Sequence, residues 1–349
     1  MTDIIKGVIS GGWLLLVGWI FPTSINVALF SLLVLPSLQE KGWAHGITHA
    51  DAIGKSLAFI TVSVFVGLLG SMTKTPAYRM LEGYLLPSKL ASYAIERQKT
   101  KKNDLTKKIE DVEAPAELAA ITTGHGDAGP AAVGSVNQGG GKKDKKAKRA
   151  ISRAKVGLWR EKLDRYPGDD SQIMPTRLGN AIRRFETYGQ DRYQIDAVAL
   201  WYELSFSVPK ELRDQIDSAR ANVDFFVCLL YGHVLVAVSA GATLLAADHP
   251  YALILWASMI GLLAFSYLWY LCATRMTDNW AAVIRAMINL GRKPMAESLG
   301  LKVPASLEEE RKMWEYVSAL VSEPYILEAS QLINPFRAQK SENIEGPAR

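Results

Sequence analysis

The chain has 349 residues, with 40 lysines and arginines against 35 aspartates and glutamates, a formal net charge of +5 and a mean hydropathy of +0.05. Its two cysteines, Cys228 and Cys272, both lie in apolar stretches, which excludes a disulfide framework and a cysteine-based metal cluster. Two long regions carry almost no charge and the remaining chain is rich in it, which predicts an integral membrane protein.

The first charge-poor region predicts two membrane-spanning helices. Residues 11–35 carry no charge, and residues 54–70 carry only Lys55 at one end. A spanning helix needs roughly 20 apolar residues. Residues 11–35 exceed the apolar core of about 7–15 residues in a signal peptide, so a retained helix that is kinked or tilted at Pro22 is favoured. The alternative is a re-entrant pair split at residues 22–24.

Two histidines and a carboxylate follow in the loop between these spans. His45 and His49 are four residues apart, which places both imidazoles on one face of a helix, and Asp51 follows them. Such a set could bind zinc. Because no other motif supports a metal site, we expect neither a metal nor another cofactor.

A charged segment follows the second span. Residues 72–88, with Arg79 and Tyr84, suit a helix that lies at the membrane interface. Residues 89–113 predict a highly charged helix. Residues 122–141 are mostly Gly, Ala, Thr and polar residues without periodicity, which is typical of a flexible linker.

A basic run, KKDKKAKR, occupies residues 142–149. We expect it to contact anionic lipid headgroups, with each charge near the surface contributing about 1 kcal/mol. The alternative is a nucleic-acid contact, which is disfavoured because no aromatic residues alternate with the lysines. The lysines concerned are Lys142, Lys143, Lys145 and Lys146.

Helices are predicted next over residues 147–165 and 176–220, where Pro175 precedes one helix and Pro209 precedes another. No helix breaker separates Lys210 from the third apolar run at residues 222–247, so one long helix is expected to enter the membrane there.

The fourth apolar run, residues 251–273, is joined to the third by only three residues, so the two should form an antiparallel hairpin. The fourth helix should continue until Pro294. Residues 306–322 begin with a serine cap and an acidic first turn, which predicts an amphipathic helix. No strand is predicted. The expected fold class is therefore all-α: four transmembrane helices, with a helical cytoplasmic domain built from residues 71–221 and the C-terminal helices.

Polar residues within the spans are the candidate functional groups, because each is costly in hydrocarbon. His233 lies roughly 16 Å deep at 1.5 Å per residue. It is expected to hydrogen-bond to a neighbouring helix, and the alternative is a pore-lining or proton-sensitive group. Asn26 and Ser24 lie within the first span. Antiparallel pairing of the third and fourth spans places Asp224 level with Arg275, which predicts a structural salt bridge between them; the alternative is a gate.

The distribution of positive charge predicts the orientation. All lysines and arginines except Lys6, Lys41 and Lys55 lie in residues 71–221 and 274–349. Positive charge accumulates on the cytoplasmic side of membrane proteins, so both termini are predicted to be cytoplasmic.

Two segments carry a family resemblance. Residues 75–84, TPAYRMLEGY, and residues 174–201, with a PTRLGN…RY…DA…LW pattern, resemble a family of uncharacterised bacterial integral membrane proteins. The resemblance implies a bacterial inner membrane and no known activity. Thr176 and Asn180 are expected to satisfy backbone groups at a helix start. The alternative is a ligand, phosphate or lipid site formed by Arg177, Arg183, Arg184 and Arg192.

No catalytic motif is found, so no enzyme activity and no catalytic residue are predicted.

The favoured function is an oligomeric regulated channel or pore-forming effector that is gated by the cytoplasmic helices, in bacterial stress or defence. The alternative is a membrane-anchored adaptor that docks a partner protein. The expected partners are the lipid bilayer, further copies of the chain and a cytoplasmic protein or signal ligand, but not nucleic acid. The predicted domains are residues 1–71, 72–121, 122–149, 150–221, 222–273 and 274–349.

Overall fold

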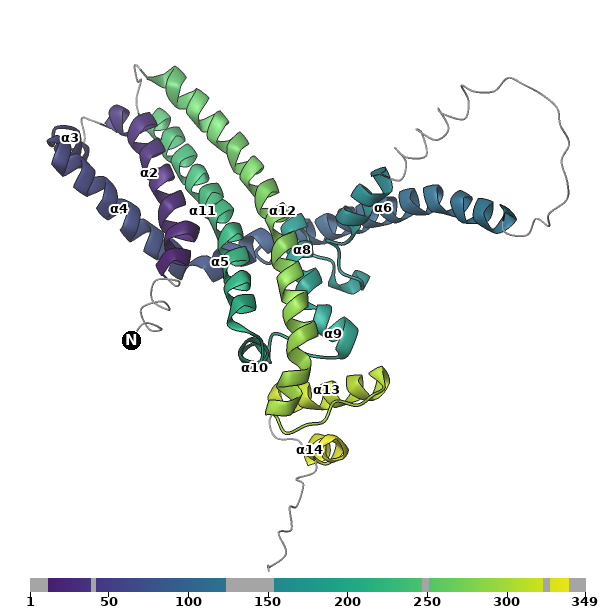
Figure 1. Cartoon of the computed structure of the whole chain (residues 1–349). Coiled ribbons are helices and arrows are strands. Elements are labelled where there is room, and N and C mark those ends of the chain that lie inside the picture. Colours follow the sequence, from purple (N-terminus) through teal and green to yellow (C-terminus); the bar gives the residue numbers. More distant parts are fainter. Residues whose placement is uncertain (1–11, 39–41, 124–153, 247–250, 323–326, 339–349) are drawn as a thin grey trace, which may run out of the picture. The chain divides into compact units, whose positions relative to one another are not determined.

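The computed structural model describes residues 12–38, 42–123, 154–246, 251–322 and 327–338, and over these residues the protein is all-α, as predicted (Figure 1). Within them the extended pairing is limited to an isolated antiparallel bridge between Leu301 and Arg337. The chain divides into two compact units. The first comprises residues 1–80 and 185–349, and the second comprises residues 81–184.

Four helices of the first unit are long and apolar enough to cross a membrane, as predicted. They are residues 12–33, α4 (Ala52–Met72), α11 (Lys210–Ala246) and α12 (Ala252–Ser298). α11 has 37 residues and α12 has 47, so at 1.5 Å per residue they extend about 55 and 70 Å. Since a bilayer core is about 30 Å thick, both helices continue well beyond it. The predicted long extensions of the third and fourth spans are confirmed.

The first span is one continuous helix with a local change of winding before Pro22. A π turn, η1 (Leu16–Ile20), precedes α2 (Phe21–Leu33), and the backbone N–H of Phe21 donates to the carbonyl of Leu16. Proline has no N–H for the helical ladder, and a wider turn before it accommodates the missing donor. The alternative of a re-entrant pair is therefore wrong.

A short 3-10 turn, η2 (Leu35–Leu38), and α3 (Gly42–Thr48) connect the first span to α4. Asp51 caps the start of α4, and its carboxylate accepts a hydrogen bond from the backbone N–H of Gly54 at 2.9 Å. This is the usual way in which an aspartate satisfies the free N–H groups of a helix start. α5 (Lys74–Glu82) follows α4 almost directly.

The first span lies between α4 and α11, and α11 packs along α12 (Figure 1). α4 approaches the first span closely at Gly67, where an added methyl group would lie 3.0 Å from the Cα of Ile20. On the other side, a buried apolar core joins the first span to α11 and α12. Its members are Val34, Val236, Ala237, Ala240, Leu255 and Leu262.

The far end of α12 carries the remaining helices of the first unit. These are α9 (Tyr188–Tyr193), α10 (Trp201–Phe206), α13 (Leu307–Ser322), α14 (Leu327–Leu332) and the 3-10 turn η4 (Asn334–Phe336). Arg292 of α12 forms an ion pair with the buried Glu310 of α13, which also accepts a hydrogen bond from Trp314 at 3.2 Å. The predicted helix over residues 306–322 is confirmed as α13.

Two sequence predictions about helix ends are wrong. α12 does not stop at Pro294 but continues to Ser298, because the following Met295 and Ala296 are fully buried against other helices. Of the helices predicted over residues 176–220, the one after Pro209 is present at the start of α11, but the one after Pro175 is broken: Gln194 adopts a left-handed conformation, with φ of 62°, and ends α9. The carboxylate of Asp196 then accepts hydrogen bonds from two backbone N–H groups and starts a new turn.

The second unit contains α6 (Ser88–Thr123), a helix over residues 154–163, the 3-10 turn η3 (Asp170–Gln172) and most of α8 (Arg177–Glu186). The predicted charged helix over residues 89–113 is confirmed within α6. Lys102 ties α6 to the segment before α8, because its ammonium group lies 2.6 Å from a carboxylate oxygen of Asp170. Nearly all of the predicted linker and basic run lies outside the described residues.

Candidate functional site

Buried polar side chains join the first span to α11. Trp19 contacts Asp224 and Thr23 contacts Cys228, and in both pairs the two residues are 205 positions apart. A constant offset means that the two helices run in the same direction and in register. Asn26 and His233, 207 positions apart, continue the series. We call the six residues Trp19, Thr23, Asn26, Asp224, Cys228 and His233 the polar row.

His233 lies at the centre of the span and both of its ring nitrogens have partners. Nδ1 lies 2.8 Å from Oδ1 of Asn26, and Nε2 accepts a hydrogen bond from the indole N–H of Trp269 at 3.2 Å. Because an indole nitrogen can only donate, Nε2 carries no proton, and Nδ1–H donates to Asn26. The predicted hydrogen bond from His233 to a neighbouring helix is therefore present, and the side chain is only 5% exposed.

Asn26 is held at its place by the backbone of both helices. Its Nδ2 donates to the carbonyl of Pro22 at 2.9 Å and to that of Cys228 at 3.4 Å. The amide packs directly on Gly232, where an added methyl group would lie 1.9 Å from Nδ2. Glycine is required at this position, because any side chain would displace Asn26 from its partners.

Asp224 has different partners from the predicted one. Its carboxylate accepts a hydrogen bond from the hydroxyl of Tyr78 at 2.7 Å and one from the indole of Trp19 at 3.4 Å. The predicted salt bridge to Arg275 is wrong, because the Arg275 side chain is exposed while Asp224 is buried against the first span and α5. Two residues at the same depth of a hairpin can face opposite sides of it. Hydrogen-bond donors thus compensate the burial of this carboxyl group.

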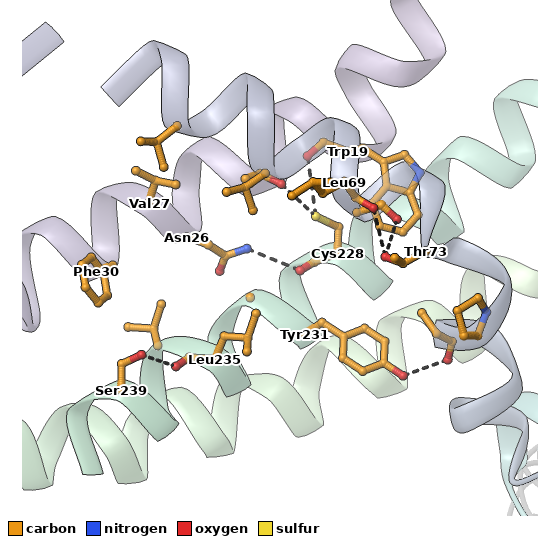
Figure 2. Close-up of a pocket in the computed structure, with 18 of the residues that line it drawn as sticks. Trp19, Asn26, Val27, Phe30, Leu69, Thr73, Cys228, Tyr231, Leu235 and Ser239 are labelled. Atoms are coloured by element: carbon orange, nitrogen blue, oxygen red, sulfur yellow. Dashed lines mark hydrogen bonds between the residues drawn. The ribbon is translucent and has the colours of Figure 1, made fainter. Parts of the chain in front are cut away.

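Beside the polar row lies a cavity of about 670 Å³ that is bounded by the first span, α4, α5 and α11. We call it the intramembrane groove (Figure 2). Its lining is mostly apolar, with Phe30, Val66 and Leu235 among the larger side chains. Ser24 is not among the residues that line it, and its hydroxyl donates to the carbonyl of Phe21 at 2.7 Å within the first span.

The polar side chains that line the groove already have partners within the chain. The hydroxyl of Tyr231 donates to the carbonyl of Ala77 at 2.8 Å, and that of Ser239 donates to the carbonyl of Leu235 at 2.8 Å (Figure 2). The groove therefore offers a ligand mainly apolar contacts. A second cavity of about 870 Å³ lies between the first span, α3 and α4 and shares Val27, Phe30 and Val62 with the groove.

The four arginines of the predicted ligand site are divided between the two units. Arg177, Arg183 and Arg184 belong to the second unit and Arg192 to the first. The guanidinium group of Arg183 donates to the side-chain carbonyl of Gln172 at 2.8 and 2.5 Å. Lys142, Lys143, Lys145 and Lys146, the other predicted anion contacts, lie outside the described residues.

Positive charges do gather locally in the second unit. Partial burial lowers the pKa of the Lys101 ammonium group, and the neighbouring charges of Arg177 and Arg97 lower it further. Nearby, Thr176 accepts a hydrogen bond from the N–H of Gly179 at 2.9 Å, and Asn180 accepts one from the N–H of Met174 at 2.8 Å. The predicted backbone-capping roles of Thr176 and Asn180 are therefore present.

The histidine pair between the first span and α4 does not form a metal site with Asp51. The rings of His45 and His49 lie 4.1 Å apart between centroids, while Asp51 bonds to Gly54 at the start of α4. Within the described ranges no group of three His, Cys, Asp or Glu side chains is close enough to hold a metal ion.

Sequence reasoning missed six residues of this site: Trp19, Thr23, Tyr78, Cys228, Gly232 and Trp269. Hydropathy marks polar atoms in a span, but it does not identify the tryptophan or tyrosine that satisfies them. A signal was available for Gly232, because it directly precedes the intramembrane His233 in the sequence. No family model, no curated protein and no solved structure matches the chain.

Proposed function

We propose that the protein is a membrane-anchored adaptor of the bacterial inner membrane, which docks a partner protein on its cytoplasmic helices. The observation that carries the proposal is a second apolar face on the segment around α10. Leu200, Leu204 and Val208, every fourth residue, are buried. On the opposite side, Val198, Tyr202 and Phe206 are 68%, 72% and 74% exposed. We call these three residues the outer α10 face.

The outer α10 face lies beyond the bilayer. α11 begins at Lys210, and the predicted third span begins near residue 222, so about 18 Å of helix separates the two points. Contact with lipid therefore does not account for the exposed apolar side chains. A contiguous exposed patch of aliphatic and aromatic residues outside the membrane is typical of a protein-binding surface.

The buried side of α10 packs closely on α12. α10 contacts the extension of α12, and at Gly291 an added methyl group would lie 2.9 Å from the side chain of Val208. α12 continues without interruption into the fourth span. A partner bound at α10 would thus be held at a fixed distance from the membrane.

The chemistry of the patch indicates the kind of partner. The guanidinium group of Arg213 lies 5.7 Å from the ring centre of Phe206. An amphipathic helix with apolar residues on one face and an acidic residue at its edge would match both features. The proposal involves no catalytic step.

Photo-crosslinking in native membranes tests the proposal. A photoreactive amino acid at Tyr202 should capture one defined protein, and the double variant Val198→Ser/Phe206→Ser should abolish the capture while leaving the detergent elution profile unchanged. The matched control is the same photoreactive group at Glu211, an exposed position on the adjacent helix, which should capture little. Capture of a second copy of this chain at Tyr202, or no capture that depends on Val198 and Phe206, would contradict the adaptor proposal.

An oligomeric regulated channel is the second candidate function, and α4 is the feature that favours it. Most side chains of α4 are exposed in the single chain, and its buried positions are Ser63 and Gly67. Apolar helices with small residues on one face commonly pack against other helices in membranes. If α4 packs against another copy, light scattering in mild detergent should give the mass of a defined ring. A monomeric mass would exclude this function.

The channel proposal also makes a demand on the polar row. His233 and Asn26 bond to each other inside one chain, so lining a water-filled pore would require this bond to open. Ion flux through reconstituted protein should then change in His233→Leu while membrane insertion is retained. If the wild-type protein conducts no ions whenever a partner is bound at the outer α10 face, the adaptor function is favoured.

A further inference from the structure

The intramembrane groove opens sideways, toward the region where lipid would lie. The first span forms its floor, and α4 and α11 form its walls. Val62 and Val66 on one wall are 44% and 41% exposed, and Leu235 on the other is 64% exposed. A groove with such rims inside a bilayer is accessible to lipid chains without passage through water.

We propose that this groove is a binding site for one acyl chain of an anionic phospholipid. The first argument is chemical. The lining is apolar, and the hydroxyl and amide groups in it are occupied by Ala77, Leu235 and Cys228 of the same chain. A ligand with buried polar groups would find few partners here, whereas a hydrocarbon chain needs none. The inference is independent of the proposed docking function.

The second argument is size. The cavity of about 670 Å³ extends along α11 from Cys228 to Ser239, which is about 16 Å at 1.5 Å per residue. A single extended hydrocarbon chain fits a cavity of this length and volume. The second cavity, which shares Phe30 with the groove, gives room for the end of a longer chain.

The third argument concerns the headgroup. α5 closes one end of the groove with Pro76, Ala77 and Met80, directly after the end of the second span. Lys74 and Arg79 lie on the same helix, on the two sides of the lining face, and the Arg79 side chain is exposed. Cationic side chains at the membrane surface favour anionic phospholipids. The acyl chain would thus lie in the groove while its phosphate lies near Arg79.

A phospholipid with a diazirine near the end of one acyl chain tests the site in the full-length protein in nanodiscs. Peptides covering residues 62–73 and 228–239 should be labelled at least fivefold more than the peptide covering residues 253–268 of α12, which lies outside the groove and has many exposed side chains. Val66→Trp, which fills the groove, should abolish this excess. Leu253→Trp, a matched substitution at an 83% exposed position outside the groove, should leave it unchanged. Equal labelling of α4, α11 and α12 in the wild type would overturn the proposal.

Two further measurements keep the test decisive. If Val66→Trp alters the thermal unfolding midpoint, Leu69→Trp replaces it as the groove-filling variant. The proposal fails if neither variant, when well folded, reduces the excess labelling.

The headgroup is tested with Arg79→Ala, in nanodiscs that contain phosphatidylglycerol or phosphatidylcholine. The variant should lose a severalfold preference for the anionic lipid. An unchanged preference would overturn the assignment of the phosphate to Arg79.

Discussion

α4 and α11 contain apolar windows of the same mean hydropathy, 2.0, yet they are packed differently. In α11, 44% of the window is buried inside the protein, and in α4 only 11%. Hydropathy measures compatibility with lipid, which both helices share. What distinguishes them is the polar and small residues: α11 presents Cys228, Gly232 and His233 to the first span, and each meets a specific partner there. α11 thus packs inside the protein and stabilises the fold, whereas most side chains of α4 are exposed in the single chain.

The largest effect should follow from filling the contact between Gly232 and Asn26. Gly232→Ala places a methyl group 1.9 Å from the Asn26 amide, and such overpacking should destabilise the protein by about 2 kcal/mol. Gly261→Ala on α12 is the matched control, because an added methyl group there meets nothing within 4 Å. Thermal unfolding followed by size-exclusion chromatography in detergent measures both. Equal stability of the two variants would show that the first span and α11 are not packed as described.

A smaller effect should follow from removing one partner of the polar row. His233→Leu leaves the Oδ1 of Asn26 without a donor, and Asn26→Leu leaves the Nδ1–H of His233 without an acceptor. Each should cost about 1–2 kcal/mol, with a coupling of roughly 1 kcal/mol in a double-mutant cycle. Ser24→Ala, which removes a hydroxyl bonded only to its own helix, should change stability much less. Additive effects of the two substitutions would contradict a direct bond.

Substitutions around Asp224 distinguish its observed partner, Tyr78, from the one predicted from the sequence, Arg275. Tyr78→Phe removes the hydroxyl that donates to this carboxylate at 2.7 Å and should lower stability by about 1–2 kcal/mol. Arg275→Gln should leave stability within about 0.5 kcal/mol of the wild type, as for most exposed positions. Denaturation in mixed detergent micelles measures the difference. A larger loss of stability in Arg275→Gln than in Tyr78→Phe would support the predicted salt bridge between Asp224 and Arg275.

The smallest effects are expected on α4. Leu57→Ala and Phe65→Ala remove side chains that are 65% and 62% exposed, so each should change the stability of the monomer by less than about 0.5 kcal/mol. The same substitutions sharpen the choice between the two proposed functions. If α4 joins copies of the chain into a channel, they should lower the oligomer mass measured by light scattering. An unchanged mass distribution would leave α4 in contact with lipid alone.

The sequence predicts the parts of this fold that depend on length, hydropathy and breakers. The four spans follow from charge-free runs, and the long α11 follows from the absence of proline or glycine between Lys210 and Leu230. The Asp224 and Arg275 prediction was wrong about direction around the helix axis, which hydropathy does not determine.

The remaining features depend on tertiary contacts. α12 passes through Pro294 because Met295 is completely buried, and α9 ends at Gln194 in a left-handed conformation that sequence preferences assign more readily to glycine. In the candidate site, Asn26 and His233 were identified by their cost in hydrocarbon. The hydrogen bond between Asn26 and His233 could not be predicted, because the sequence does not show that the first and third spans are parallel and in register.

A disulfide crosslink between the first span and α11 tests that register most directly. The hydroxyl of Thr23 lies 3.3 Å from the sulfur of Cys228, which suits a disulfide after Thr23→Cys. In membranes, with Cys272 replaced by alanine, mild oxidation should join positions 23 and 228 within one chain, as detected by mass spectrometry of the linked peptides. Ser24→Cys, one residue further along the same helix, should not form the link. Absence of the Thr23→Cys crosslink, or equal crosslinking from position 24, would contradict the polar row.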